Sequence, residues 1–279
     1  MRIGCSGWNY KSWRGRFYPA DLPANQWLGY YERVFDTVEV NNTFYRLPDA
    51  ATFAGWRRQT HDGFLMSVKA SRYLTHLKRL TEPEEPVQRL FERAASLGSR
   101  LGPILYQLPP SLALDVDRLT AFLDALPDAL PARARSRTPR QPIRHVIEFR
   151  HASWYVDEVF RLLDARGVAI CLHDKPGSAF DDVAVGPFVY VRFHGPTGRY
   201  GGCYTDEALS AWAAKLAGAH RCGRDVFAYF NNDIDGFAVQ NAQTLRRLTG
   251  AKSAPEVRSS NLTSRLRRTG RKGAARTEA

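Results

Sequence analysis

Charged and polar residues end one short apolar segment after another in this sequence. The set comprises Glu39, Asn41, Lys69, Gln107, Glu148, Arg150, Arg192, His194, Asn231 and Asn232. Imidazoles, carboxylates and amines are the side chains that most often move protons in enzymes, and lysine and arginine bind anions. Their recurrence at equivalent points of successive segments predicts one shared site.

Alternation of residue types within each segment places these polar side chains on one face. Successive side chains of a strand point to opposite faces, so Val38 and Val40 lie opposite Glu39. The same alternation separates Ile147 from Glu148. In a barrel of strands the apolar face packs outward against helices, so the polar face points into the mouth.

The charges of this predicted mouth are unequal. Glu39 and Glu148 are its two carboxylates, whereas its cations are three, namely Lys69, Arg150 and Arg192. The guanidinium group can form two parallel hydrogen bonds to a phosphate or a carboxylate. We therefore expect the mouth to bind an anionic small molecule, with hydrolytic or acid–base chemistry as the reaction class and catalysis itself left open.

Three residues receive catalytic roles in this interpretation. A carboxylate surrounded by cations has a lowered pKa, which suits a general base or an orienting group. We assign that role to Glu148, proton transfer to His194, and the place of second catalytic carboxylate to Glu39.

Aromatic residues in the loops after the segments extend the predicted site. Trp8, Tyr45 and Trp154 each follow a segment end, and aromatic walls with a few polar groups are typical of ligand pockets. The residues that we assign to ligand binding are Lys69, Arg150, Arg192, Asn41, Gln107, Trp8, Tyr45, Trp154, Asn231 and Asn232.

A plug of mutually paired charges, such as Glu148 with Arg150, is the structural alternative to a ligand site. Barrel interiors are more often filled with Val, Ile and Leu, and an unpaired buried ion costs several kcal/mol. We therefore favour the ligand site.

A divalent-metal site is a second alternative, which would make the protein a metal-dependent hydrolase, nuclease or isomerase. Residues of the types that ligate metals are Glu39, Glu148, His173, Asp174 and His194. Three cations in the same mouth would repel a metal ion, and no HxH or HExxH spacing is present. No metal ligand is assigned and no cofactor is expected.

A non-catalytic nucleic-acid-binding or regulatory module is the third alternative. From Ala251 onward the chain has eight Lys or Arg against two Glu, which accounts for half of the formal net charge of +12. Such a tail, or the mouth itself, would attract nucleic acid electrostatically. A solvated, disordered tail over 251–279 is the preferred interpretation.

Short apolar segments alternate with longer amphipathic ones, which predicts strands and helices in turn. The predicted strands are Arg2–Ser6, Thr37–Asn41, Phe64–Lys69, Ile104–Gln107, His145–Arg150, Val168–His173, Phe188–His194 and Val226–Asn231. The predicted helices are Gln26–Val34, Ala50–Gln59, Glu84–Leu97, Asp117–Leu126, Trp154–Ala165, Asp206–Ala217 and Ala238–Leu248.

Eight strand–helix units at this length predict an α/β fold of one domain, a (β/α)8 TIM-type barrel over residues 1–250. An open doubly wound sheet would usually have a glycine-rich nucleotide turn after its first strand, and GCSGWNY does not match one. Asp128–Pro142 is predicted to be a surface insertion and Lys175–Pro187 a loop.

Other features of the composition predict a cytoplasmic protein. No apolar run approaches the roughly 20 residues that span a bilayer, and the amino terminus lacks a signal-peptide pattern. The four cysteines are scattered, which indicates reduced structural thiols. We expect no membrane partner, and the oligomeric state is not predicted.

Several segments of the chain resemble a known family. They are IGCSGWNYKSWRGRFYP, FDTVEVNNTFYRLP, VKASRYLTH, LGPILYQLPPS, VIEFRHASW, VYVRFHG and YFNNDIDGFAVQNA. In this order, from Met1 to Leu248, they are similar to the signatures of the YecE-like family, the domain of unknown function 72. The resemblance implies a barrel related to the xylose-isomerase and endonuclease IV type, with no settled reaction. The sixth segment, AICLHDKPG, departs from the family pattern and weakens the case for His173.

Overall fold

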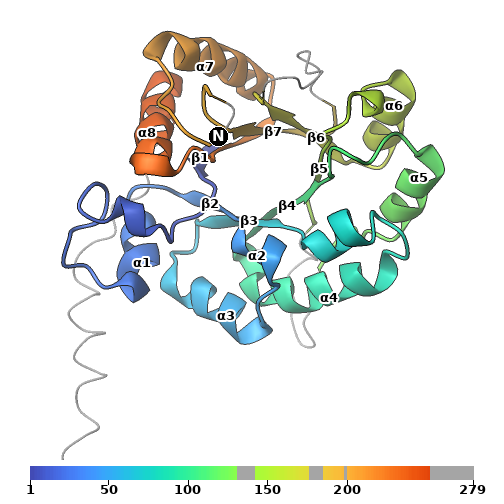
Figure 1. Ribbon diagram of the computed structural model, residues 1–279, viewed down its shortest axis with the longest axis horizontal. Helices are drawn as coiled ribbons and strands as arrows, with labels where there is room; N and C mark the ends of the chain where they lie inside the picture. Colours follow the sequence, from blue (N-terminus) through green and yellow to red (C-terminus); the bar gives the residue numbers. More distant parts are fainter. Residues whose placement is uncertain (131–141, 176–184, 198–199, 252–279) are drawn as a thin grey trace, which may run out of the picture.

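The computed structural model describes residues 1–130, 142–175, 185–197 and 200–251. Eight parallel strands lie in the middle of the molecule, with helices around them (Figure 1). The strands are β1 Arg2–Cys5, β2 Thr37–Val40, β3 Leu65–Lys69, β4 Leu101–Gln107, β5 His145–Glu148, β6 Ala169–His173, β7 Phe188–Phe193 and β8 Asp225–Phe230.

Helices alternate with the strands along the chain. The α-helices are α1 Trp27–Tyr31, α2 Asn42–Tyr45, α3 Ala50–Gln59, α4 Glu84–Ala94, α5 Val116–Asp124, α6 Asp157–Ala165, α7 Asp206–Arg221 and α8 Phe237–Thr249. Shorter helical turns are η1 Lys11–Trp13, η2 Ala24–Gln26, η3 Tyr73–Leu77, η4 Ala95–Arg100, η5 Ala152–Trp154 and η6 Ile234–Gly236. Buried apolar residues line one side of α4, α5 and α6, as expected for helices that cover a sheet.

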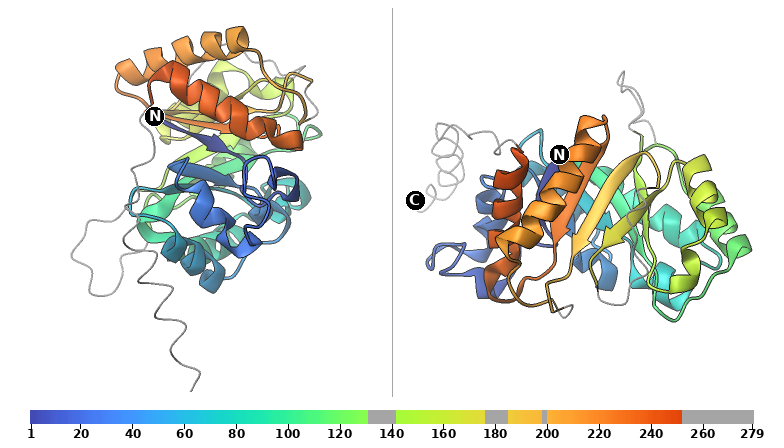
Figure 2. Two further views of the ribbon diagram at one scale, coloured as in Figure 1. Left: turned by 90° about the vertical axis from the view of Figure 1, so that its left-hand side faces the viewer. Right: turned by 90° about the horizontal axis from the view of Figure 1, so that it is seen from above.

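The predicted TIM-type barrel is confirmed. The strands pair in the order β1-β8-β7-β6-β5-β4-β3-β2, all in parallel, and the helices flank them on both sides in Figure 2. The strands point toward the face that Figure 1 presents, so the loops after them form that face. The predicted insertion lies mostly outside the described residues, but Ala129 and Pro142 at its base form an antiparallel bridge.

Some predicted boundaries differ from the structure. The first predicted helix, Gln26–Val34, is only five residues long as α1, and α2 was not predicted. The predicted helix Trp154–Ala165 starts later, because η5 and an extended Val156 precede α6. Most of the predicted loop between β6 and β7 and of the predicted tail lies outside the described residues.

Inward and outward strand positions carry different residues, as the alternation predicted. Outward residues such as Val38 and Val40 belong to the large apolar core beneath the helices. A second, smaller apolar cluster lies inside the barrel and consists of Leu105, Val146, Ala169, Cys171, Phe188, Tyr190, Phe227 and Tyr229. Above it, toward the carboxyl ends of the strands, the inward positions are charged.

The strands β1 and β2 are the two ends of the pairing order, and a side chain connects them. The Tyr31 hydroxyl accepts a hydrogen bond from the Cys5 amide (2.8 Å) and donates one to the Thr37 carbonyl (3.1 Å). A Cβ at Gly4 would lie 2.3 Å from that carbonyl, so only glycine fits this approach. Tyr31 therefore occupies the place of a main-chain contact.

In the described part of the chain, no helix has the length and apolar character needed to cross a membrane.

Candidate functional site

Arg192 on β7 is the centre of the charged layer inside the barrel mouth. Its side chain is 1% exposed, its Nη1 donates to Glu148 Oε2 at 2.7 Å, and its Nη2 donates to Glu39 Oε1 at 2.9 Å. The guanidinium thus joins carboxylates from β2 and β5 across the barrel. We call Arg192 and the residues around it the mouth cluster, which comprises Glu39, Lys69, Gln107, Glu148, Arg150, Arg192 and His194.

Glu39 is held by four hydrogen-bond donors in a fully buried position. Besides Arg192, the Ser6 hydroxyl donates to Oε1 at 2.6 Å and the Tyr190 hydroxyl donates to Oε2 at 2.6 Å. A carboxylate with both oxygens occupied orients its neighbours and has little capacity to accept a substrate proton. The geometry supports a positioning role for Glu39 rather than the catalytic one that we predicted.

Glu148 is ionised and shared between two arginines. Burial alone would raise the pKa of this carboxyl, but the guanidinium groups of Arg150 and Arg192 lower it well below its usual range. Arg150 Nε donates to Oε1 and Arg192 Nη1 to Oε2. The predicted pairing of Glu148 with Arg150 is therefore present, and this carboxylate is a weak base that holds cations in place.

His194 is neutral and supports Arg150. Burial lowers the pKa of the imidazole to about 4. Arg150 Nη2 lies 3.0 Å from His194 Nε2, and a guanidinium can only donate, so Nε2 accepts and the ring proton is on Nδ1. Nδ1 faces Asp174 Oδ1 at 3.5 Å. Since Nε2 is already occupied, His194 is poorly placed for the proton transfer that we predicted for it.

Lys69 at the end of β3 is the group in the cluster that titrates near neutrality. Its Nζ donates to Gln107 Oε1 at 2.7 Å and lies 4.1 Å from the centre of the Phe44 ring. The residue is 8% exposed. Burial, followed by repulsion from Arg192, lowers the pKa of Lys69 to about 7. In the described residues no carboxylate oxygen lies within ion-pair distance of this ammonium group.

The cations left for a ligand are fewer than the sequence suggested. Arg192 is fully engaged by the two carboxylates, and Arg150 uses Nε and Nη2 for Glu148 and His194. Arg150 Nη1 has no partner among the residues that the structure describes. An anion at the mouth would therefore meet Lys69 and one edge of Arg150, whereas Arg192 holds the site together from below.

Two asparagines complete the mouth on its β1–β8 side. Asn41 Nδ2 lies 3.4 Å from both the Ser6 carbonyl and Asn231 Oδ1, so the two predicted asparagines are adjacent. Asn41 Oδ1 is buried and has no hydrogen-bond partner within the described chain. This oxygen is free to accept a hydrogen bond from a ligand.

Comparison with known proteins places the chain in a family. A family model described as protein of unknown function DUF72 matches residues 2–264. The chain belongs to the DUF72 family. The resemblance found in the sequence is thereby confirmed.

Relatives of this DUF72 barrel include two curated bacterial proteins. UPF0759 protein YunF of Bacillus subtilis is 24% identical over 280 residues, which cover 88% of this chain and 93% of that protein. UPF0759 protein YecE of Escherichia coli is 32% identical over 111 residues, or 39% of this chain and 41% of that protein.

Solved structures with the same fold include a DUF72 family protein from Thermotoga maritima. That protein has 26% identity and a TM-score of 0.77, with 89% of this chain and 98% of that chain covered. A D-psicose 3-epimerase crystallised with D-fructose has a TM-score of 0.53 at 13% identity, with 90% of this chain and all of that chain covered. The second likeness shows the barrel fold alone.

Two aromatic residues that we assigned to ligand binding lie elsewhere in this DUF72 barrel. Trp154 is fully buried, stacks on Phe149 with ring centres 4.9 Å apart, and donates from Nε1 to the Leu112 carbonyl at 2.7 Å. It is a core residue because η5 turns it back beneath the loop. Tyr45 is 77% exposed on α2 and, in the described residues, forms no hydrogen bond with the mouth cluster.

Two further assignments are also structural in position. Asn232 is fully buried, and its Nδ2 donates to the Gly202 carbonyl and to Asn241 Oδ1. Trp8 is half-buried and packs edge-on against Trp56. By contrast, Phe44 was not in our assigned set although its ring contacts Lys69. Its position directly before Tyr45, after the second strand, is the signal that could have found it.

The donor set for a metal ion does not come together in the described residues. No group of three or more His, Cys, Asp or Glu side chains is close enough to hold one. Glu39 and Glu148 are each occupied by arginine, and Asp174 accepts from the Tyr204 hydroxyl and the His194 amide. These residues do not fit a divalent cation, and no step is assigned to one.

Proposed function

We propose that the barrel mouth binds a small anionic molecule between Lys69 and Arg150 and that Lys69 exchanges a proton with it. The observation that carries this proposal is the environment of Lys69. Its buried ammonium group has an amide oxygen and an aromatic ring as neighbours and no paired carboxylate in the described chain. Such a lysine gains a counter-ion only when a ligand supplies one.

Proton exchange follows from the same environment. With a pKa of about 7, Lys69 is partly neutral and partly charged at neutral pH. A bound anion close to Nζ favours the charged form and raises the pKa, so ligand binding draws a proton onto Lys69. That proton is then positioned for general-acid transfer to the ligand, and the neutral amine is a general base in the reverse direction.

The rest of the mouth cluster positions these two cations. Glu148 and His194 fix the plane of the Arg150 guanidinium, and Arg192 fixes Glu148. Gln107 fixes the Lys69 ammonium group through its amide oxygen. Preorganised charges of this kind stabilise charge that develops during a reaction.

Sulfate titration by calorimetry tests the binding half of the proposal, because sulfate stays a dianion at every pH of the experiment. Lys69→Met should weaken sulfate binding about tenfold, the loss of one charge-assisted hydrogen bond. Lys215→Met, on the exposed side of α7, removes the same charge and should leave the affinity unchanged. Equal affinities of wild type and Lys69→Met would contradict the proposal.

Competitive acetylation measured by mass spectrometry tests the proton-exchange half. The rate of Lys69 acetylation should reach half its maximum near pH 7, and sulfate should move this midpoint upward. Lys215 in the same sample is the internal control and should titrate like an ordinary lysine. A Lys69 midpoint at the ordinary lysine value would remove the acid–base role.

A further inference from the structure

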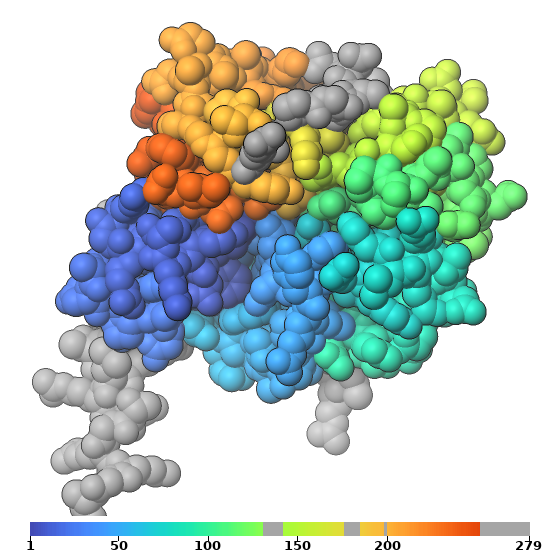
Figure 3. Space-filling model, viewed as in Figure 1, coloured from blue at the N-terminus to red at the C-terminus, as the bar shows by residue number. Residues whose placement is uncertain are grey.

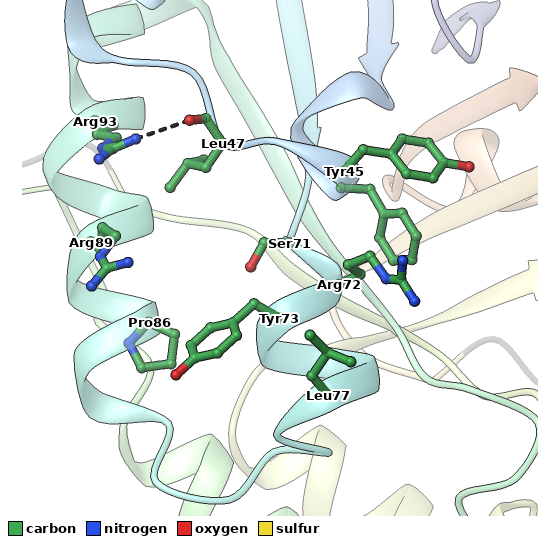
Figure 4. Close-up of a pocket in the computed structure, with 10 residues that line it drawn as sticks. Tyr45, Leu47, Ser71, Arg72, Tyr73, Leu77, Pro86, Arg89 and Arg93 are labelled. Carbon is green, nitrogen blue, oxygen red and sulfur yellow. Dashed lines mark hydrogen bonds between the residues drawn. The ribbon is translucent and has the colours of Figure 1, made fainter.

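A groove lies beside the mouth, between α2, η3 and α4. It encloses about 370 Å³, and its lining residues are Phe44, Tyr45, Leu47, Ser71, Arg72, Tyr73, Leu77, Pro86, Arg89 and Arg93. Figure 4 shows Tyr73 and Leu77 rising from η3 on one side and Arg89 and Arg93 projecting from α4 on the other. The light-blue and cyan segments that carry them are adjacent on the face drawn in Figure 3. We call this feature the rim groove.

The rim groove is cationic. Three of its lining residues are arginines, and none is Asp or Glu. Arg93 Nη1 donates to the Leu47 carbonyl at 2.9 Å, so one edge of that guanidinium is fixed. Arg89 pairs with Glu85, but both side chains are more than half exposed, and such a pair is weak and easily exchanged. Arg72 is exposed and forms no hydrogen bond with any residue that the structure describes.

Exposed apolar side chains gather in the same place. Tyr45, Tyr73 and Leu77 are 77%, 42% and 63% exposed. They are half of the six large apolar residues that are exposed in the described chain. Exposed apolar groups that cluster mark interaction sites, whereas scattered ones do not.

The backbone that presents these residues is unusual. The turn η3 is π-helical, and Arg79, Leu80 and Glu82 shortly after it have positive φ angles. Single π turns and left-handed non-glycine residues cost free energy and occur often at functional sites.

We propose that the rim groove binds single-stranded nucleic acid. Guanidinium groups form paired hydrogen bonds with phosphate, and exposed tyrosine faces stack on bases of any sequence. Arg72, Arg89 and Tyr73 offer both contacts within one groove. An acidic lining would repel the backbone, and the groove has none. This site shares only Phe44 with the surroundings of Lys69, so it does not depend on the proposal for the mouth.

Fluorescence anisotropy with a fluorescein-labelled deoxythymidine strand of about ten nucleotides tests this site in the full chain. The affinity is measured at several salt concentrations. Arg72→Gln/Arg89→Gln should lower the slope of log K against log salt by about 1.4, since each phosphate contact contributes about 0.7 for single strands. The matched control, Arg58→Gln/Arg161→Gln, removes two exposed arginines on α3 and α6 and should keep the wild-type slope.

The aromatic half of the groove is tested with side chains of similar size. Tyr45→Leu/Tyr73→Leu keeps the apolar surface but removes the stacking faces, and should weaken binding about tenfold or more without a change in slope. Tyr45→Phe/Tyr73→Phe should bind like the wild type. Thermal melting of each variant verifies folding.

Three results would overturn the proposal. Absence of strand binding by the wild type would refute it directly. Equal slopes for the groove pair and the control pair would assign binding to overall charge. Full binding by the leucine pair would show that no base stacks on these tyrosines. Lys69→Met should keep strand binding while its sulfate affinity falls about tenfold, which separates the two proposals.

Discussion

Two polar layers lie inside the barrel, built from inward positions two residues apart on the same strands. In the lower layer, which we call the hydroxyl layer, Tyr229 joins Thr37 (2.7 Å) and Ser67 (2.9 Å) through their hydroxyl oxygens. In the upper layer the same two strands carry Glu39 and Lys69, which belong to the mouth cluster. The hydroxyl layer is neutral and internally satisfied, whereas the mouth cluster is charged and leaves Lys69 without a counter-ion.

The difference separates satisfied neutral groups from charged ones inside one barrel interior. Neutral hydroxyls from β2, β3 and β8 that hydrogen-bond to one another can be buried in the interior at little cost in free energy. Charges in the same volume cost several kcal/mol unless they are paired, and Arg192 provides that pairing for both carboxylates. The residues that the pairing leaves over, Lys69 and one edge of Arg150, are the ones available to a ligand.

Of the replacements that test the contrast between the two layers, that of Arg192 should change the free energy of unfolding most. Arg192→Met leaves Glu39 and Glu148 buried without their shared cation, so the free energy of unfolding should fall by about 3–5 kcal/mol. Urea denaturation at neutral pH measures it. Glu39→Gln in the same chain removes one of the stranded charges and should restore part of the loss. A loss below about 1 kcal/mol would mean that the pairing is not what holds the mouth cluster.

Replacement of Lys69 should raise the free energy of unfolding, whereas replacement of Arg192 lowers it. The folded pKa of about 7 lies below the ordinary value of 10.5, so the unfolded chain binds this proton more tightly. The wild type should therefore gain stability from this group as pH rises from about 7 to about 10.5, and carry the full penalty below about 7. Lys69→Met should raise the free energy of unfolding at pH 6 by about 2 kcal/mol, because the uncompensated charge is gone while Gln107 loses its donor. Urea denaturation across this pH range checks it, and parallel curves for the two proteins would show an unshifted pKa.

In the hydroxyl layer, Tyr229→Phe should lower the free energy of unfolding by about 1–2 kcal/mol. The change removes the oxygen between Thr37 and Ser67 and leaves two buried hydroxyls with fewer partners. Sulfate affinity should be unchanged, since this layer contributes no charge. Thermal melting and calorimetry on one preparation measure both quantities, and a loss of sulfate binding would show that the two layers are not independent.

The smallest effect is expected for His194→Leu. Arg150 would lose one hydrogen-bond acceptor but keep Glu148, so sulfate affinity should fall about fivefold, the equivalent of one hydrogen bond. Calorimetry measures this against His194→Gln, whose amide oxygen can accept from Arg150 and should retain affinity. A total loss of binding in both variants would restore a direct role for His194.

Most of the fold could be predicted from the sequence because the physics there is local. Alternation in TVEV and HVIE determines which side chains face the helices and which face the barrel interior, and strand–helix repetition determines a parallel barrel. The boundaries near α1 and η5 could not be, since short helical turns depend on what packs against them. Trp154 shows this. Its indole stacks on Phe149 and donates to the Leu112 carbonyl, and these tertiary contacts leave no mark in the local sequence pattern that predicts helices.

The members of the mouth cluster were also predictable, but their roles were not. Parity identifies Glu39, Lys69 and Arg192 as inward, yet it does not say which cation pairs with which carboxylate across the barrel. That depends on side-chain length and on which strand lies opposite. The rim groove could not be predicted for a related reason. In the sequence, Arg72 and Arg89 are indistinguishable from ordinary surface arginines, and only the structure shows that they line one groove with Tyr73.

The contact at Tyr31 closes the barrel between the two strands at which the pairing order ends. Elsewhere a change in strand separation must break main-chain hydrogen bonds, but between β1 and β2 the spacing depends on a phenol ring carried by α1. Ser6 at the end of β1 and Glu39 on β2 lie across the same spacing. Tyr31 thus joins the outer helix α1 to the pair of strands that carries the Ser6–Glu39 contact, and Glu39 in turn accepts from Arg192 at the mouth.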